Sequence, residues 1–180
     1  MPKKQNKRVF FAVNLPLELK KKILETFLEK LPEELNIVKA INLHITLYFL
    51  GYWPEEAIAE ARDKLADFNF PRFEVKISKI GHFSSRVLWL GITKGSSELI
   101  ALHSKLCKVL DLPFDNRFHP HITLARNRSL NYKRFREIVD ELSKIKFEER
   151  FSVKSFELME SKLRSSGAEY KQLFSVKLVD

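Results

Sequence analysis

The chain has 180 residues, of which 44% are hydrophobic and 31% charged, so it fits one domain with a buried core and is not expected to be disordered. Its single cysteine excludes an intramolecular disulfide framework and a cysteine-rich metal centre, and no apolar run approaches the ~18 residues of a membrane span. The net charge of +9 favours either a polyanionic partner such as nucleic acid or a surface kept soluble by like charge, and we expect a cytoplasmic protein.

The first half of the chain predicts an alternation of strands and helices. Its elements are expected at residues 8–14 (strand), 17–31 (helix), 44–47 (strand), 54–68 (helix) and 73–79 (strand). Both helices carry apolar residues at the 3.6-residue spacing of an amphipathic helix, and Pro54 suits the first helical position. The closing strand alternates apolar and polar residues, which is typical of a half-buried strand.

The second half repeats this order at a constant offset. The tetrapeptide His-Ile-Thr-Leu begins at His44 and again at His121, 77 residues later. The helix that follows the second half's first strand is expected to start near Ser96 or Ser97 as its N-cap. The same shift carries the first strand near residues 86–92 and the other elements onto residues 94–108, 131–145 and 150–156.

The repeat sets the expected domain organisation. We predict two related halves, residues 8–80 and 86–158, within a single domain of residues 1–180. A turn at Ser165-Ser166-Gly167 is expected to precede a last strand over residues 169–179.

Each repeat places a histidine and a threonine on one side of a strand. Side chains two residues apart on a strand point to the same face, so His44 projects with Thr46. His121 projects with Thr123 in the same way. If a twofold relation brings both pairs to one groove, one imidazole can act as general acid and the other as base, while the hydroxyls donate to a phosphoryl oxygen. This set predicts displacement at phosphorus without a metal ion.

The remaining histidines and the single cysteine bear on whether the chain has another site. His119 and His121 form a His-Pro-His sequence that could hold a metal, although no Asp, Glu or Cys follows at ligand spacing. His82 is expected in a turn, His103 in a helical stripe and Cys107 as a packed thiol, none of them catalytic.

The halves differ at one position that bears on phosphate binding. Arg126 stands where the first half has Phe49, so we expect only one side of the groove to carry a permanent positive charge there. Arg126 either holds a phosphate through two parallel hydrogen bonds, which we favour, or is a solvated charge at a strand end. The aromatic residues that could stack on bases are Phe10, Phe11, Tyr48, Trp89 and Phe118.

Taken together, these segments resemble a known family. The matching pieces are residues 8–13, residues 42–51 and 118–126 around the two His-Ile-Thr-Leu motifs, and residues 156–163 with Gly167 and Tyr170. They are similar to the 2H phosphoesterase superfamily and, within it, to the RNA 2′,3′-cyclic phosphodiesterase family, historically called 2′-5′ RNA ligases. The likeness spans nearly the whole chain, and its one small departure is His119, at a position that varies.

The resemblance implies an α+β fold of two antiparallel-sheet lobes, with outer helices, around a central cleft that carries both HxTx motifs. It implies hydrolysis of an RNA-terminal 2′,3′-cyclic phosphate to a 2′-phosphate, with His44 as proton donor and His121 as proton acceptor. Thr46 and Thr123 would hold the phosphoryl oxygens. With an RNA 5′-hydroxyl in place of water, the site would form a 2′-5′ linkage reversibly and without ATP. The partner would be RNA, the chain monomeric, and neither a cofactor nor a metal would be required.

Two other functions stay open from the sequence. One is a catalytically silent RNA-binding module built on the same duplication. The other is a 2′,5′-phosphodiesterase, or a phosphodiesterase of another small cyclic nucleotide. Incubation with a nucleoside 2′,3′-cyclic phosphate in EDTA would distinguish the silent module from the enzyme.

Overall fold

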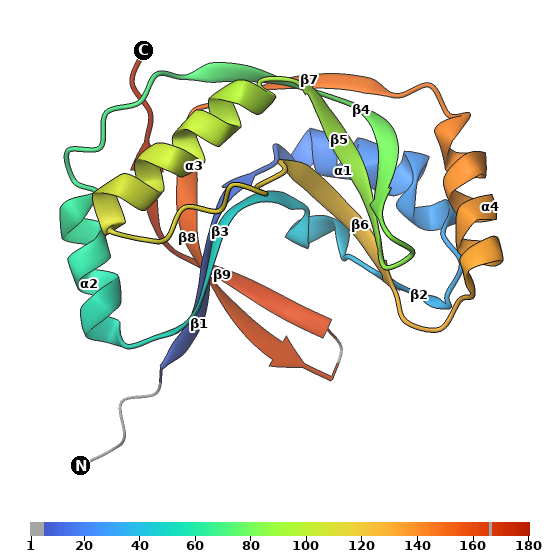
Figure 1. The fold of residues 1–180 in the computed structure, drawn as a ribbon, viewed down its shortest axis with the longest axis horizontal. Coiled ribbons are helices and arrows are strands. Elements are labelled where there is room, and N and C mark those ends of the chain that lie inside the picture. Colours follow the sequence, from blue (N-terminus) through green and yellow to red (C-terminus); the bar gives the residue numbers. More distant parts are fainter. Residues whose placement is uncertain (1–5, 166) are drawn as a thin grey trace.

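The computed structural model describes residues 6–165 and 167–180, whose strands form one curled sheet with helices on the outside (Figure 1). The strands are β1 (Lys7–Asn14), β2 (Leu35–Ile37), β3 (His44–Trp53), β4 (Phe73–Phe83), β5 (Val87–Lys94), β6 (His121–Asn127), β7 (Glu148–Val153), β8 (Ser155–Arg164) and β9 (Gly167–Lys177). The helices are α1 (Leu17–Thr26), α2 (Glu55–Lys64), α3 (Ser96–Leu110) and α4 (Tyr132–Ser143), with 3₁₀ turns η1 (Leu28–Lys30) and η2 (Ala40–Asn42). None of these helices in the described chain combines the length and apolar character needed to cross a membrane.

The sheet joins two groups of four antiparallel strands. The strand order is β7-β4-β5-β6-β3-β1-β8-β9, and the short β2 pairs with β6. In the middle, β3 meets β6 through the pair Ile45 and Ile122, both fully buried. Helices α2 and α3 lie side by side at one end of the molecule and α4 lies at the other (Figure 1). The predicted α+β class, with antiparallel strands and outer helices, is confirmed.

The central pair also marks a local twofold axis. Ile45 and Ile122 are separated by 77 positions, the offset of the sequence repeat, and they face each other on antiparallel strands. An antiparallel pair of equivalent residues is what a twofold axis through the pair produces. The flanking strands keep the same offset in their registers, which pair Asn14 with His44 and Gly91 with His121.

The strands of the two sequence halves are interleaved in space. β4 closes the first half of the chain, yet it pairs with β5 and β7 of the second. Conversely, β8 pairs with β1 from the first half. Each group of four strands therefore contains strands from both halves of the chain, so neither half completes its own sheet.

Several helix boundaries differ from those predicted, among them the end of α2, which stops at Lys64 and not at residue 68. The apolar spacing predicts one helix over residues 17–31, but α1 ends at Thr26 and the chain tightens into η1. Pro54 lies just before α2, at its N-cap and not at its first helical position. Gly95, with a φ of +84°, caps α3 in place of Ser96 or Ser97, because a turn that enters the helix with positive φ favours glycine.

The predicted strands at residues 8–14, 44–47 and 73–79 are present, but other details of the strands differ from the prediction. β4 continues to Phe83, so His82 lies within a strand and not in a turn. The run at residues 150–156 is divided between β7 and β8, which pair with different neighbours. β2 was not anticipated, since three residues carry no usable periodicity. The predicted turn at residues 165–167 includes Ser166, which lies outside the described residues.

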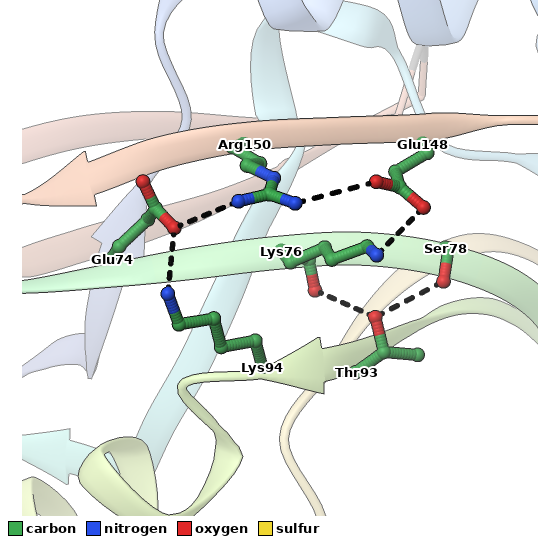
Figure 2. Close-up of polar contacts among 7 residues, drawn as sticks. All are labelled: Glu74, Lys76, Ser78, Thr93, Lys94, Glu148 and Arg150. Atoms are coloured by element: carbon green, nitrogen blue, oxygen red, sulfur yellow. Dashed lines mark hydrogen bonds and ion pairs between the residues drawn. The ribbon is translucent and has the colours of Figure 1, made fainter.

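A chain of ion pairs crosses β7, β4 and β5 on the open face of the sheet (Figure 2). Its successive contacts are Lys94–Glu74 (3.0 Å), Glu74–Arg150 (3.5 Å), Arg150–Glu148 (3.6 Å) and Glu148–Lys76 (2.7 Å). Beside it the hydroxyls of Ser78 and Thr93 lie 3.0 Å apart. The basic residues of this region are therefore neutralised by carboxylates, so this part of the face is not a free polyanion-binding patch.

Candidate active site

Both histidine–threonine pairs lie at the centre of the open face of the sheet. All four side chains are half-buried: His44 and Thr46 on β3, His121 and Thr123 on β6. Because β3 and β6 run antiparallel through the pair Ile45 and Ile122, His44 lies toward Thr123. By the same symmetry, Thr46 lies toward His121. The structure thus brings together the four side chains that the sequence repeat singles out.

The two imidazoles are oriented by equivalent hydrogen bonds. Nδ1 of His44 lies 2.6 Å from the carbonyl oxygen of Asn42, and Nδ1 of His121 lies 2.7 Å from that of His119. A carbonyl oxygen only accepts, so in each ring Nδ1 carries a hydrogen that it donates. This leaves Nε2 for the chemistry. Nε2 of His44 lies 2.9 Å from Oγ1 of Thr46, whose hydroxyl donates to the neutral ring.

The surroundings of both histidines favour the neutral form of the ring. Burial lowers the pKa of His44 from 6.5 to about 4, and the charges of Lys20 and His121 act in the same direction. Burial is also the main reason that the pKa of His121 is lowered, with Arg126 and His119 adding to it. In both rings the hydrogen bond to the carbonyl opposes the shift in pKa. A bound phosphate anion would raise both pKa values and allow one ring to hold a proton.

Lys20 is a buried residue behind His44 that the sequence did not single out. Its ammonium donates to the carbonyl oxygen of Ile41 at 2.6 Å, in the turn η2 that also supplies the Asn42 carbonyl. Burial lowers the pKa of Lys20, and the carboxylate of Glu157 opposes that shift. In the sequence, Lys20 belongs to a run of lysines on a predicted helix, which indicates only a solvated face.

Arg126 faces the cleft because of a β-bulge in β6. Thr123 pairs with Trp89 and Ala125 with Leu88, so Leu124 has no partner and the alternation of side chains is reversed beyond it. Arg126 therefore returns to the face that carries His121 and Thr123, and its side chain is exposed. Its charge lowers the pKa of His121, which places the guanidinium within electrostatic reach of that ring.

The first half carries a guanidinium of its own, so the expectation that only one side of the cleft is charged was wrong. A bulge at Leu47 turns Phe49, the counterpart of Arg126, toward the same face. The guanidinium of Arg8 lies over the Phe49 ring, 4.7 Å from its centroid, and donates to Oγ of Ser161 at 3.0 Å. Sequence comparison of the halves missed this because Arg8 reaches the position from the neighbouring strand.

Tyr170 closes the cleft on the side of His44. Its ring packs edge-on against His44, with centroids 5.4 Å apart, and against Phe10 at 4.9 Å. Burial raises the pKa of Tyr170, whereas the charges of Arg8 and Arg126 lower it. Both guanidinium groups therefore act electrostatically on Tyr170, whose ring lies beside His44.

Only some of the aromatic residues proposed for base stacking are accessible to a base. Phe11 is fully buried in the core, and Phe10 is 3% exposed beneath His44, so neither presents a face to a base. Trp89 packs against His121 with ring centroids 6.1 Å apart, as a support for that ring. Tyr48 and Phe118 do border open space, in the pocket described next.

A pocket of about 550 Å³ opens beside His121. We call it the aromatic pocket; it is lined by Thr46, Leu47, Tyr48, Phe49, Phe83, His103, Asp115, Arg117, Phe118, His119 and His121. Of the described site residues, His44, Thr123 and Arg126 do not line it. The pocket therefore lies on one side of the cleft, where it is lined by Thr46 of the first histidine–threonine pair and His121 of the second.

Comparison with known proteins identifies the family of this chain. The model of the 2′-5′ RNA ligase superfamily matches residues 20–164. The chain belongs to the 2′-5′ RNA ligase superfamily. It is 33% identical over 176 residues to a protein of Archaeoglobus fulgidus named RNA 2′,3′-cyclic phosphodiesterase, covering 92% of this chain and 97% of that one.

A second relative and a solved structure are also similar to this chain over most of its length. A protein of Aeropyrum pernix with the same name is 33% identical over 157 residues, which is 79% of this chain and 86% of that protein. The crystal structure of Escherichia coli LigT complexed with 3′-AMP is 28% identical, covers 98% of this chain and 100% of that one, and superposes with a TM-score of 0.80.

The remaining candidate residues of this 2′-5′ RNA ligase superfamily member are accounted for by packing. His103 is 1% exposed and its Nδ1 donates to the carbonyl oxygen of Leu47 at 2.8 Å. Cys107 is buried, as predicted, and burial raises the pKa of its thiol. His82 is hydrogen-bonded to Ser84 and to Arg136. Across the described ranges, no three His, Cys, Asp or Glu side chains gather at a spacing that would hold a metal ion.

Proposed function

We propose that this chain hydrolyses 2′,3′-cyclic phosphate ends of RNA to 2′-phosphates. The observation that carries the proposal is the pair of His-x-Thr strands related by the twofold axis at Ile45 and Ile122, with each Nδ1 fixed so that Nε2 is left for chemistry. The shared name of the relatives, RNA 2′,3′-cyclic phosphodiesterase, supports the substrate class.

In the proposed reaction, a water oxygen attacks phosphorus and Nε2 of His121 takes its proton. The bond from phosphorus to O3′ breaks on the opposite side, and protonated His44 gives its proton to O3′. The products are a 2′-phosphate and a free 3′-hydroxyl. Each histidine ends in the protonation state of its partner, so a proton exchange with solvent restores the site.

The hydroxyls and guanidinium groups would stabilise the charge that develops at phosphorus. Thr46 and Thr123 donate to the phosphoryl oxygens, and their position between the two rings suits that role. Arg126 is expected to hold the phosphate through parallel hydrogen bonds. The anion supplies the negative charge that raises the pKa of His44 from about 4.

The proposal extends to the state of the protein. We take residues 1–180 as one domain with related halves at residues 8–80 and 86–158 and an additional C-terminal strand. A monomeric state and a cytoplasmic location stay predictions. The same site acting on a 2′-5′ linkage is the reverse of ligation and needs no separate machinery.

The test is product analysis with a short RNA that ends in a 2′,3′-cyclic phosphate, in the presence of EDTA. We expect conversion to the 2′-phosphate, and a loss of at least ~10²-fold in turnover for His44→Ala and for His121→Ala. The double variant should be little worse than either, because the two rings act as a unit. His82→Ala, which removes a histidine outside the cleft, is the control and should keep wild-type turnover.

Two results would contradict the proposal. An intact cyclic phosphate after prolonged incubation with folded protein would indicate the silent RNA-binding module. Activity that is lost in EDTA and restored by a divalent ion would exclude the metal-free reaction.

A further inference from the structure

The aromatic pocket has rigid walls that the proposed hydrolysis does not use. The ring of His103 stacks on Phe118, with centroids 4.2 Å apart and planes 11° apart, and on Tyr48 at 5.7 Å and 16°. His103 is anchored to the carbonyl of Leu47, and the Tyr48 hydroxyl donates to that of Pro113 at 3.1 Å. The three stacked rings are therefore held in place before any ligand arrives.

The dimensions and chemistry of this pocket suit a nucleoside. Its volume of about 550 Å³ falls in the range typical of small-molecule sites. Aromatic faces bind nucleobases by stacking, at ~1–3 kcal/mol for each base. Phe49, which also lines the pocket, is 50% exposed and carries the Arg8 guanidinium over its ring.

Positive charge borders the pocket. Arg8 lies over the Phe49 ring and has no ion pair with any described residue. Arg117 extends into solvent, with 91% of its side chain exposed, although Asp115 lies 3.9 Å from it. A nucleoside in the pocket would thus have a guanidinium nearby for an adjoining phosphate.

The position of the pocket decides which nucleoside it holds. Displacement at phosphorus proceeds in line, so the entering and leaving oxygens lie on opposite sides of the phosphorus atom. The pocket is lined by His121, the proton acceptor for the entering hydroxyl, and not by His44, the proton donor for the leaving O3′. The occupant of the pocket therefore lies on the entering side.

We propose that the aromatic pocket is the binding site for the nucleoside at the 5′-hydroxyl end of a second RNA, which replaces water in the reaction. This inference rests on the proposed function and on its assignment of His121. The 5′-hydroxyl oxygen bonds to phosphorus and its proton passes to Nε2 of His121, while the bond to O3′ breaks and His44 protonates O3′. A 2′-5′ phosphodiester and a free 3′-hydroxyl result, with no other reactant, and the reverse reaction cleaves that linkage.

The experiment compares two substrates that differ on the entering side. A mononucleoside 2′,3′-cyclic phosphate needs only water there, whereas a 2′,5′-linked dinucleoside monophosphate, cleaved in the reverse direction, places a nucleoside in the pocket. Phe118→Leu removes the stacking ring but keeps apolar volume. We expect KM for the dinucleotide to rise about tenfold or more and KM for the cyclic phosphate to change less than about twofold.

Two further variants separate stacking from damage to the fold. Phe118→Tyr keeps the ring and should retain near-wild-type KM for the dinucleotide. Tyr52→Ala removes another exposed aromatic residue of β3 that lies outside the pocket and should change neither substrate.

The outcomes distinguish this inference from the proposed function. Wild-type protein that processes neither substrate contradicts the proposed function itself. Wild-type protein that hydrolyses the cyclic phosphate but never cleaves the 2′-5′ linkage overturns the pocket assignment alone. Equal rises in KM for both substrates in Phe118→Leu would also overturn it, because they would place the cyclic phosphate's own nucleoside in the pocket.

Discussion

Because the pKa of His44 is low in the folded protein, we predict that this residue lowers the free energy of unfolding at acidic pH. Its pKa is 6.5 in an unfolded chain and about 4 in the folded site, mainly because the ring is buried. Between these values the unfolded state binds more protons, so the free energy of unfolding falls as the pH is lowered through this range. A shift of this size removes about 2 kcal/mol between pH values near 7 and near 5.

Replacing the ring should abolish that part of the pH dependence. We expect His44→Ala to lose about 2 kcal/mol less than wild type on going from about pH 7 to about pH 5. Urea unfolding at both pH values, in buffers free of phosphate, measures the difference. Carboxylates such as Glu74, whose pKa is lowered by Lys94, titrate in both proteins and cancel in the comparison.

A second variant checks that the effect belongs to the imidazole. Thr46→Val alters the same cleft but keeps His44 buried, so its stability should fall with pH as in wild type. If wild type and His44→Ala lose the same free energy of unfolding over this range, the ring is not held neutral by burial and the reasoning is wrong.

Three more predictions follow from the site. Because the pKa values of His44 and His121 are both lowered, the singly protonated pair is most populated below pH 6.5, so kcat/KM should peak on the acidic side of that value; a kcat/KM that rises steadily to about pH 8 would contradict this. Arg126→Ala should reduce kcat/KM by the equivalent of about 1.5–3 kcal/mol and Arg126→Lys by less, with little change in melting temperature; a lower melting temperature with unchanged kinetics would make the residue structural. A Cβ added at Gly81 would lie 2.1 Å from the Trp89 ring, so Gly81→Ala should lower the free energy of unfolding by about 1–3 kcal/mol in urea titration, whereas an unchanged midpoint would refute the steric argument.

The sequence determined the two polar pairs and the face they share. A strand points residues i and i+2 to one side whatever it packs against, so His44 with Thr46 follows from local geometry alone. The repeat at 77 residues likewise predicted a twofold relation, and the structure places its axis at Ile45 and Ile122. Helix and strand boundaries were less accurate, because capping at Gly95 depends on how the chain enters the helix.

The tertiary structure alone decided which residues surround those pairs. Nothing in the spacing of the chain shows that Arg8 lies over Phe49, that Lys20 sits behind His44, or that β4 and β8 are exchanged between the halves. Such contacts join residues far apart in sequence, and they are fixed by which strands pair and where the bulges fall. The low pKa of His44 has the same origin, since burial is a property of everything packed around the ring and not of the ring's own neighbours in sequence.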